Sequence, residues 1–277
     1  MIGGLLALAG ALSAQAEGAP QRIVIAGGDL TEIVFALGEG ERVVAVDSTS
    51  SYPPETETLP KIGYMRRLAP EGVLTTAPDL LLAGAGAGPD SAMDRLRQAG
   101  VDVRIGPDDP SLDGVAAKIR FVGDALDRRD EAEALIDRVS GQLAAAIAAA
   151  GESEASPRVL FLMTAGRNGV LAAGADTSAQ AIIELAGGEN AVTGFNGYKP
   201  LSAEVALASA PDVLLMPTHA AEAMGGAETA LARPELAATP AGRAKRVVVI
   251  DGLLLLGFGP RTPEAVSTLA AALHGAE

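Results

Sequence analysis

The sequence predicts an α/β protein of two similar lobes, each with a parallel sheet, joined by one long α-helix. Short apolar runs alternate with helical segments at the spacing expected of parallel β-α units. Strong helix formers fill residues 130–150, between the two series of alternating segments. A motif in residues 63–82 returns at residues 197–215, which indicates a duplicated unit.

The first lobe is expected over residues 17–127. Asp29 is placed to cap its first helix, and Gly38 is placed to end that helix. The predicted strands are residues 22–26, 43–46, 80–83 and 101–105, and the predicted helices are residues 30–37, 70–75, 89–99 and 111–126.

The linking helix is expected over residues 128–151, and the second lobe over residues 152–277. At about 20 residues the helix would be roughly 30 Å long, which indicates a stiff connection rather than a flexible hinge. The predicted strands of the second lobe are residues 158–163, 213–216 and 247–250, and its predicted helices are residues 176–185 and 262–274.

The repeated motif aligns without a gap from Leu68 in the first copy and Leu201 in the second. Glu71 then falls on Glu204, and both copies enter an apolar strand through Ala-Pro-Asp. Before the leucine, the second copy is one residue shorter. The repeat predicts two lobes that face each other.

Residues 1–16 carry no charge and end in the small-x-small pattern Ala14-Gln15-Ala16, which predicts a secretory signal peptide. The run is too short to span a bilayer, and a disordered apolar N-terminus is the alternative. Because no cysteine follows the cleavage site, a lipoprotein anchor is not expected, and the mature chain is predicted to be exported as a soluble protein.

Composition excludes several kinds of partner. The net charge of −14 argues against nucleic acid, because phosphate binding needs clustered Lys and Arg. The absence of cysteine excludes disulfides and thiolate metal sites, and only His219 and His274 could supply imidazole. Neither histidine has an obvious partner for a nucleophilic triad, so the chain is not expected to be an enzyme.

The glycine-rich segment at residues 84–88 follows a predicted strand, as a dinucleotide-binding loop does. Its third glycine comes one residue too early for G-x-G-x-x-G, and no acidic residue ends the following strand. A tight turn at the edge of a cleft is the preferred interpretation.

Tyr64 is the strongest candidate for ligand binding, although a lone tyrosine in a loop is usually a packing residue. Arg66 and Arg67 place positive charge beside it, which favours phenolate and can pair with an anionic ligand. A phenolate oxygen is a hard donor suited to ferric iron, and tyrosine is a known axial ligand of haem.

Glu71 and Glu204 occupy the same place in the two repeats. Each could simply stabilise a helix N-terminus, by about 0.3–1 kcal/mol. As a matched pair, one on each lobe, they could instead dock on basic residues of a pseudo-symmetric partner. Their position in a duplicated motif favours docking.

Three motifs together resemble those of the periplasmic haem-binding proteins of bacterial ABC haem importers, within the group that also carries vitamin B12 and ferric siderophores. The motifs are residues 63–72, 197–204 and 257–265. The resemblance covers nearly all of the mature chain. It implies a class III periplasmic-binding-protein fold, with two Rossmann-like lobes and the ligand in the cleft between them.

The resemblance also implies roles for individual residues. Tyr64 matches the axial ligand of ferric haem b, and Arg66 matches an arginine that supports the tyrosinate or contacts haem. Glu71 and Glu204 match the paired glutamates that bridge to arginines of the permease. The chain is thus expected to be a monomeric periplasmic protein that delivers haem to an inner-membrane ABC permease dimer.

The number of haems stays open. Some family members hold a second haem with a histidine after the first strand of the second lobe, whereas here residues 164–169 contain none. Arg167 in that loop is a candidate contact for a haem propionate, as is Lys199 next to Tyr198. A corrinoid or a ferric siderophore in the same fold is the alternative ligand, and an enzyme on a doubly wound fold is the remote alternative.

Overall fold

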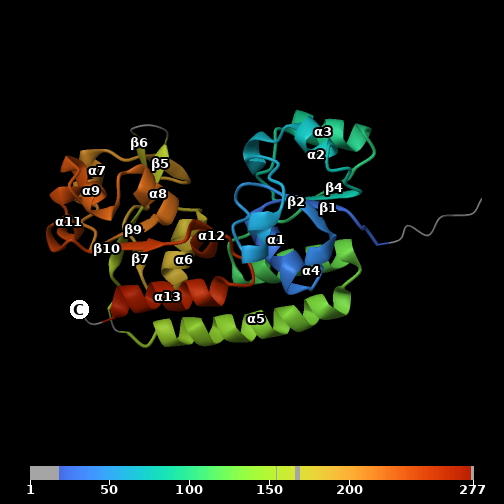
Figure 1. Cartoon of the computed structure of the whole chain (residues 1–277). Coiled ribbons are helices and arrows are strands. Elements are labelled where there is room, and N and C mark those ends of the chain that lie inside the picture. Colours follow the sequence, from blue (N-terminus) through green and yellow to red (C-terminus); the bar gives the residue numbers. More distant parts are fainter. Residues whose placement is uncertain (1–18, 154, 166–168, 276–277) are drawn as a thin grey trace, which may run out of the picture.

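The computed structural model describes residues 19–153, 155–165 and 169–275, which form two α/β lobes connected by a long helix (Figure 1). The expected signal peptide, residues 1–16, lies outside the described residues, and so does Arg167. None of the helices in the described part of the chain combines the length and apolar character that crossing a membrane requires.

The first lobe is built on a sheet of four strands that all run parallel, in the order β2-β1-β3-β4. Its elements are β1 (Ile23–Ala26), α1 (Gly28–Ala36), η1 (Gly40–Arg42), β2 (Val43–Val46), η2 (Pro54–Thr58), η3 (Met65–Arg67), α2 (Pro70–Leu74), β3 (Leu80–Ala83), α3 (Asp90–Gln98), β4 (Asp102–Ile105) and α4 (Leu112–Leu126). Strands β1 and β3 are buried along their whole length.

Helices cover both faces of this sheet, which explains why its central strands are continuous apolar runs. Ile23 and Ile25 pack with residues of α1 and α4, whereas Val24 and Ala26 pack with residues of α2 and α3. Successive side chains of a strand point to opposite faces, so the apolar run of β1 serves two layers of the core.

The second lobe has a mixed sheet, in the order β10-β9-β5-β6-β8, which corrects the expectation of a wholly parallel one. Strand β6 pairs antiparallel with both β5 and β8. Only residues 166–168 separate β5 from β6, and a parallel connection needs a dozen or more residues. The strands are β5 (Arg158–Ala165), β6 (Gly169–Ala173), β7 (Glu189–Asn190), β8 (Tyr198–Pro200), β9 (Val213–Pro217) and β10 (Val247–Ile250).

Several short helices complete the second lobe, and sequence reasoning found few of them. They are α6 (Ser178–Leu185), α7 (Ala203–Ala208), α8 (Thr218–Ala223), α9 (Ala227–Leu231), α10 (Pro234–Ala237), α11 (Pro240–Ala244), α12 (Gly252–Leu256) and α13 (Thr262–His274). His274, in the last turn of α13, is partly buried, and its Nε2 lies 3.0 Å from the carbonyl oxygen of Ala186.

Helix α5 (Arg129–Ala150) runs along one side of both lobes, next to α4 and α13 (Figure 1). Its buried residues recur at helical spacing: Ala132, Leu135, Ile136, Val139, Leu143, Ala146 and Ala150. They belong to one core cluster that also contains side chains of β1 and β5. The linking helix is therefore part of a core shared by the two lobes.

Polar contacts also tie α1 and α4 to the segment that joins α12 and α13. Lys118, which is buried, pairs with Asp29 at 2.7 Å and donates to the carbonyl oxygen of Gly257 at 2.9 Å. Asp29 lies inside the first turn of α1 and makes no capping bond, so the expectation that it caps this helix is wrong. Arg261, just before α13, pairs with Glu32 of α1 at 2.6 Å.

Candidate functional site

Tyr64 lies in a loop beyond the carboxyl end of β2, directly before η3. Tyr64 is 45% exposed, so the residue is accessible to a ligand. The loop is attached to the end of β2, because the Ser48 backbone N–H donates to the carbonyl oxygen of Gly63 at 2.8 Å. Gly63 has a φ of 93°, a conformation that favours glycine at this bend.

Asp47 holds this loop in place, and sequence reasoning missed it. Its fully buried carboxylate accepts hydrogen bonds from the backbone N–H groups of Gly27 at 3.1 Å, Thr49 at 3.0 Å and Met65 at 3.3 Å. It also accepts from the Ser50 hydroxyl at 2.9 Å. One carboxylate thus joins the loops that follow β1 and β2 to the residue after Tyr64.

The glycine-rich turn at residues 84–88 packs directly against the Tyr64 loop. Leu68 N–H donates to the Gly88 carbonyl at 2.8 Å, and Gly88 N–H donates to the Met65 carbonyl at 3.0 Å. A Cβ at Gly86 would lie 3.2 Å from the guanidinium carbon of Arg66. The glycine therefore lets Arg66 lie close to the turn, which is a tight one, with Ala87 N–H donating to the Gly84 carbonyl at 2.8 Å.

Tyr198 belongs to the second lobe, where it lies on the edge strand β8 and is 37% exposed. Burial raises the pKa of its phenol, although a hydrogen bond with the Ala179 backbone and the charge of Arg66 act to lower it. The charge of Asp108 acts to raise this pKa. Arg66 and Asp108 of the first lobe thus lie near enough to affect Tyr198, and its phenol stays protonated at neutral pH.

Lys199 does not share a face of the sheet with Tyr198, because neighbouring residues of a strand point to opposite faces. The Tyr198 ring contacts Phe161 edge to face, with centroids 6.2 Å apart. The Lys199 Nζ lies 5.1 Å from the centroid of the Phe195 ring, at cation–π distance. The structure therefore brings Tyr198 near Arg66, whereas the ammonium of Lys199 lies against the Phe195 ring.

The remaining candidates are surface residues. Arg66 and Arg67 are exposed, and among the described residues neither forms an ion pair. Glu71 and Glu204 are both exposed and lie in the first turns of α2 and α7. Within the described ranges, no group of three or more His, Asp or Glu side chains could hold a metal ion.

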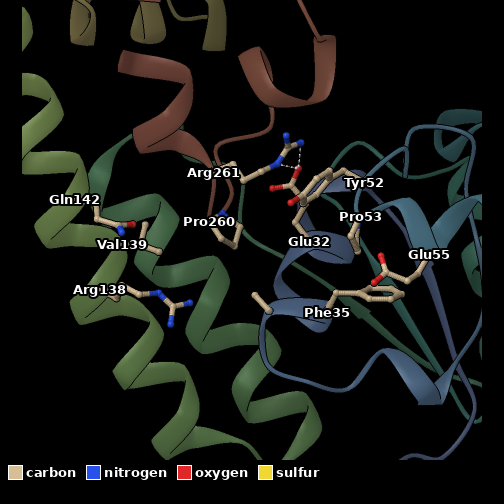
Figure 2. A pocket seen from close by; sticks show the side chains of 11 residues that line it. Glu32, Phe35, Tyr52, Pro53, Glu55, Arg138, Val139, Gln142, Pro260 and Arg261 are labelled. Atoms are coloured by element: carbon tan, nitrogen blue, oxygen red, sulfur yellow. Dashed lines mark hydrogen bonds and ion pairs between the residues drawn. The ribbon is translucent and has the colours of Figure 1, made fainter. Parts of the chain in front are cut away.

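A pocket of about 410 Å³ lies on the side of α1 that faces α5 (Figure 2). Arg261 reaches across its rim, where its guanidinium carbon stacks 3.7 Å from the centroid of the Tyr52 ring and its nitrogens bind Glu32. Arg138 of α5 lines the opposite wall. The pocket belongs to the junction between the lobes and contains none of the predicted ligand-binding residues.

Comparison with known proteins identifies a family and several relatives. The sequence profile of the periplasmic binding protein family matches residues 23–253. The periplasmic haem-binding protein RhuT from Roseiflexus sp. RS-1, solved in apo form, is 46% identical, with a TM-score of 0.89 over 92% of this chain and 98% of that one. The periplasmic haem-binding protein BhuT, solved with two haems, is 44% identical, with a TM-score of 0.87 over the same shares, 92% and 98%. A cobalamin-binding protein of Halobacterium salinarum is 28% identical over 263 residues, which are 92% of this chain and 70% of that one.

Proposed function

Because this chain belongs to the periplasmic binding protein family, we propose that it binds ferric haem between its two lobes and delivers it to an inner-membrane ABC permease. Members of this family are substrate-binding components of importers, so the protein is not an enzyme. The observation that supports haem as the ligand is the 44–46% identity, over nearly the whole chain, to two haem-binding proteins of the same fold.

Tyr64 is the proposed iron ligand. Its exposure leaves the phenol oxygen accessible, and the hydrogen bonds around Asp47 fix the loop that carries it. Arg66 and Arg67 are the nearby cations that would stabilise a phenolate, and a phenolate oxygen suits ferric iron. Because ligand and cations come from one rigid loop, little conformational entropy would be lost on binding.

The two haem propionates are the proposed partners of the remaining polar groups. Tyr198 keeps its proton and can donate a hydrogen bond to a carboxylate, and Arg66 lies on the same side. Arg167 and Lys199 remain candidates for a propionate contact. The position of Lys199 over Phe195 makes it the weaker of the two, because its ammonium would have to leave that ring.

A hemin titration tests the iron ligand. The recombinant protein should develop the absorbance of ferric haem bound by tyrosinate, and Tyr64→Phe should abolish it and weaken hemin binding at least about tenfold, or ~1.4 kcal/mol. Tyr52→Phe is the matched control, because Tyr52 is 41% exposed and Tyr64 is 45% exposed. The same titration counts haems per chain. A Tyr64→Phe variant with an unchanged spectrum and affinity would reject Tyr64 as the ligand.

A corrinoid is the second candidate ligand, because relatives at 28% identity are cobalamin-binding proteins. Parallel titrations with hemin, cyanocobalamin and a ferric hydroxamate siderophore separate the possibilities. Tight binding of hemin alone is the expected outcome, and preferential binding of cyanocobalamin or the siderophore would overturn the haem proposal.

Export is part of the same proposal. Residues 1–16 would direct the chain to the periplasm, where the mature protein would act as a soluble monomer. Mass spectrometry of the protein from the periplasmic fraction should find the N-terminus at Glu17. A retained Met1, or a chain found only in the cytoplasm, would contradict this.

A further inference from the structure

Two short surface helices, α2 and α7, present the same pair of side chains. Glu71 and Leu74 in α2 correspond to Glu204 and Leu207 in α7. In each helix the two residues are three positions apart, so the glutamate and the leucine lie on one face. Leu74 is 37% exposed and Leu207 is 53% exposed, although both are large apolar side chains.

The same backbone conformation follows each helix. Ala77 has a φ of 47° and Ala210 a φ of 41°, a left-handed conformation that alanine rarely adopts. Arg22 donates from Nη2 to the Thr76 carbonyl at 2.6 Å, and Arg158 donates from Nε to the carbonyl of Ser209, the equivalent residue, at 3.1 Å. The guanidinium groups therefore bind the carboxyl end of each helix in the same way.

Two aspartates complete this attachment. The carboxylate of Asp79 accepts the Arg22 backbone N–H at 3.0 Å, and that of Asp212 accepts the Arg158 backbone N–H at 2.9 Å. Arg22 directly precedes β1, and Arg158 begins β5. Each helix is thus fixed to the first strand of its own lobe, and the glutamate–leucine pairs stand on two rigid and equivalent supports.

The placement of the two pairs restricts what can bind them. In the view of Figure 1, α2 and α7 lie on different lobes and both on the side opposite α5. A partner that engages both must offer two equivalent surfaces. Each surface needs a cation for the glutamate and an apolar pocket for the leucine, because a leucine gains binding energy only when it leaves water.

We propose that Leu74 and Leu207 are paired apolar anchors that dock this protein on a two-fold permease dimer, with one permease subunit for each lobe. The inference rests on the proposed delivery to an ABC permease, and it adds an apolar contact to the charge contacts of Glu71 and Glu204. The glutamates would speed and orient the encounter, and the buried leucines would slow dissociation.

The test uses the haem importer of the same organism, purified and reconstituted in nanodiscs, with binding measured by biolayer interferometry. Leu74→Gln and Leu207→Gln should each weaken binding about tenfold, and the double variant about a hundredfold, because the two sites are far apart and their effects add. Leu112→Gln is the matched control, since Leu112 is 39% exposed and lies at the start of α4, outside both pairs.

Hemin affinity and oligomeric state are measured on the same samples. Unchanged hemin affinity in the double variant, together with weaker permease binding by raised dissociation rate, supports the anchors. If the double variant binds the permease as tightly as the wild type does, the proposed role of the leucines is overturned. If the wild type is a dimer and the double variant is a monomer, the leucines bind a second copy of this chain, which also overturns the proposal. Failure of the wild-type protein to bind hemin would reject the proposed ligand. Permease binding by the leucine variants would still test the anchors independently.

Discussion

Asp47 is the residue on which the position of Tyr64 depends most directly. Its carboxylate is fully buried and accepts from backbone donors that lie 20 residues before it and 18 residues after it in the chain. A buried N–H left without an acceptor costs about 1–3 kcal/mol. Asp47 therefore has a positioning role: it touches no ligand in this proposal but determines where the ligand-bearing loop lies.

Asp47→Asn tests this positioning role. The amide has one acceptor oxygen instead of two and directs N–H groups toward donors, so we expect a loss of about 2–4 kcal/mol in the free energy of unfolding. Hemin affinity should fall as well, while the tyrosinate spectrum persists at saturating hemin. Urea denaturation and hemin titration measure the two effects. Asp94→Asn, at a carboxylate with 64% exposure, is the control, and equal behaviour of the two variants would refute the role.

The sequence singles out Tyr64 and Arg66 as candidates but not Asp47, for a physical reason. Tyr64, Arg66 and Glu71 are close in the chain, so local spacing carries the signal. Asp47 stands in a polar segment that has the composition of any loop, and its partners are distant in the chain. The one local clue is its place directly after a buried strand, where the carboxyl ends of parallel strands gather polar groups.

At the scale of the elements, an ion pair that no local sequence pattern predicts joins helix α1 to the residue before α13. Glu32 and Arg261 are 229 residues apart in the chain, yet their side chains form two hydrogen bonds, at 2.6 and 3.0 Å. Burial raises the pKa of Glu32 above its ordinary value of 4.5, and the bond to Arg261 offsets part of that rise. The pair therefore contributes to stability in a pH-dependent way.

Glu32→Gln should reveal this dependence. A carboxyl group whose pKa is raised in the folded state stabilises the fold below its unfolded pKa and loses that contribution as pH rises through the folded pKa. Relative to the wild type, the free energy of unfolding of Glu32→Gln should therefore increase as pH rises from about 4.5. Urea denaturation from pH 4 to 7 measures it. A difference between variant and wild type that stays constant over this range would contradict the shifted pKa.

The strands of the first lobe were predictable, whereas β6 and β8 of the second were not. Parallel strands buried on both faces are apolar runs, as in β1 and β3. Strand β6 reads Gly-Val-Leu-Ala-Ala and β8 has only three residues, so neither shows a period or a run that separates a strand from other structure. Their pairing depends on register with β5, which is a tertiary property.

At the scale of the whole molecule, the two lobes are joined as one packed body. The core cluster continues from β1 through α5 to β5 and α13, and Lys118 and Arg261 bind across the junction. Interiors packed in this way have few alternative arrangements, so rigid-body closure would need to break several contacts at once. The long linking helix predicts a stiff connection, and the polar contacts of Lys118 and Arg261 across the junction add to it.

A distance measurement between the lobes tests this stiffness, and the absence of native cysteine makes labelling straightforward. Gln98→Cys on α3 and Glu222→Cys on α8 place spin labels at exposed positions of different lobes. Hemin should shift the distance by less than about 2 Å, as in preorganised binding proteins.

Adding Lys118→Met and Arg261→Gln to the labelled protein removes both polar contacts across the junction and should broaden the distance distribution without hemin. A larger shift in the labelled protein without these two changes would show that the lobes close on the ligand, and an unbroadened distribution in the variant would assign the stiffness to the apolar core and α5 alone.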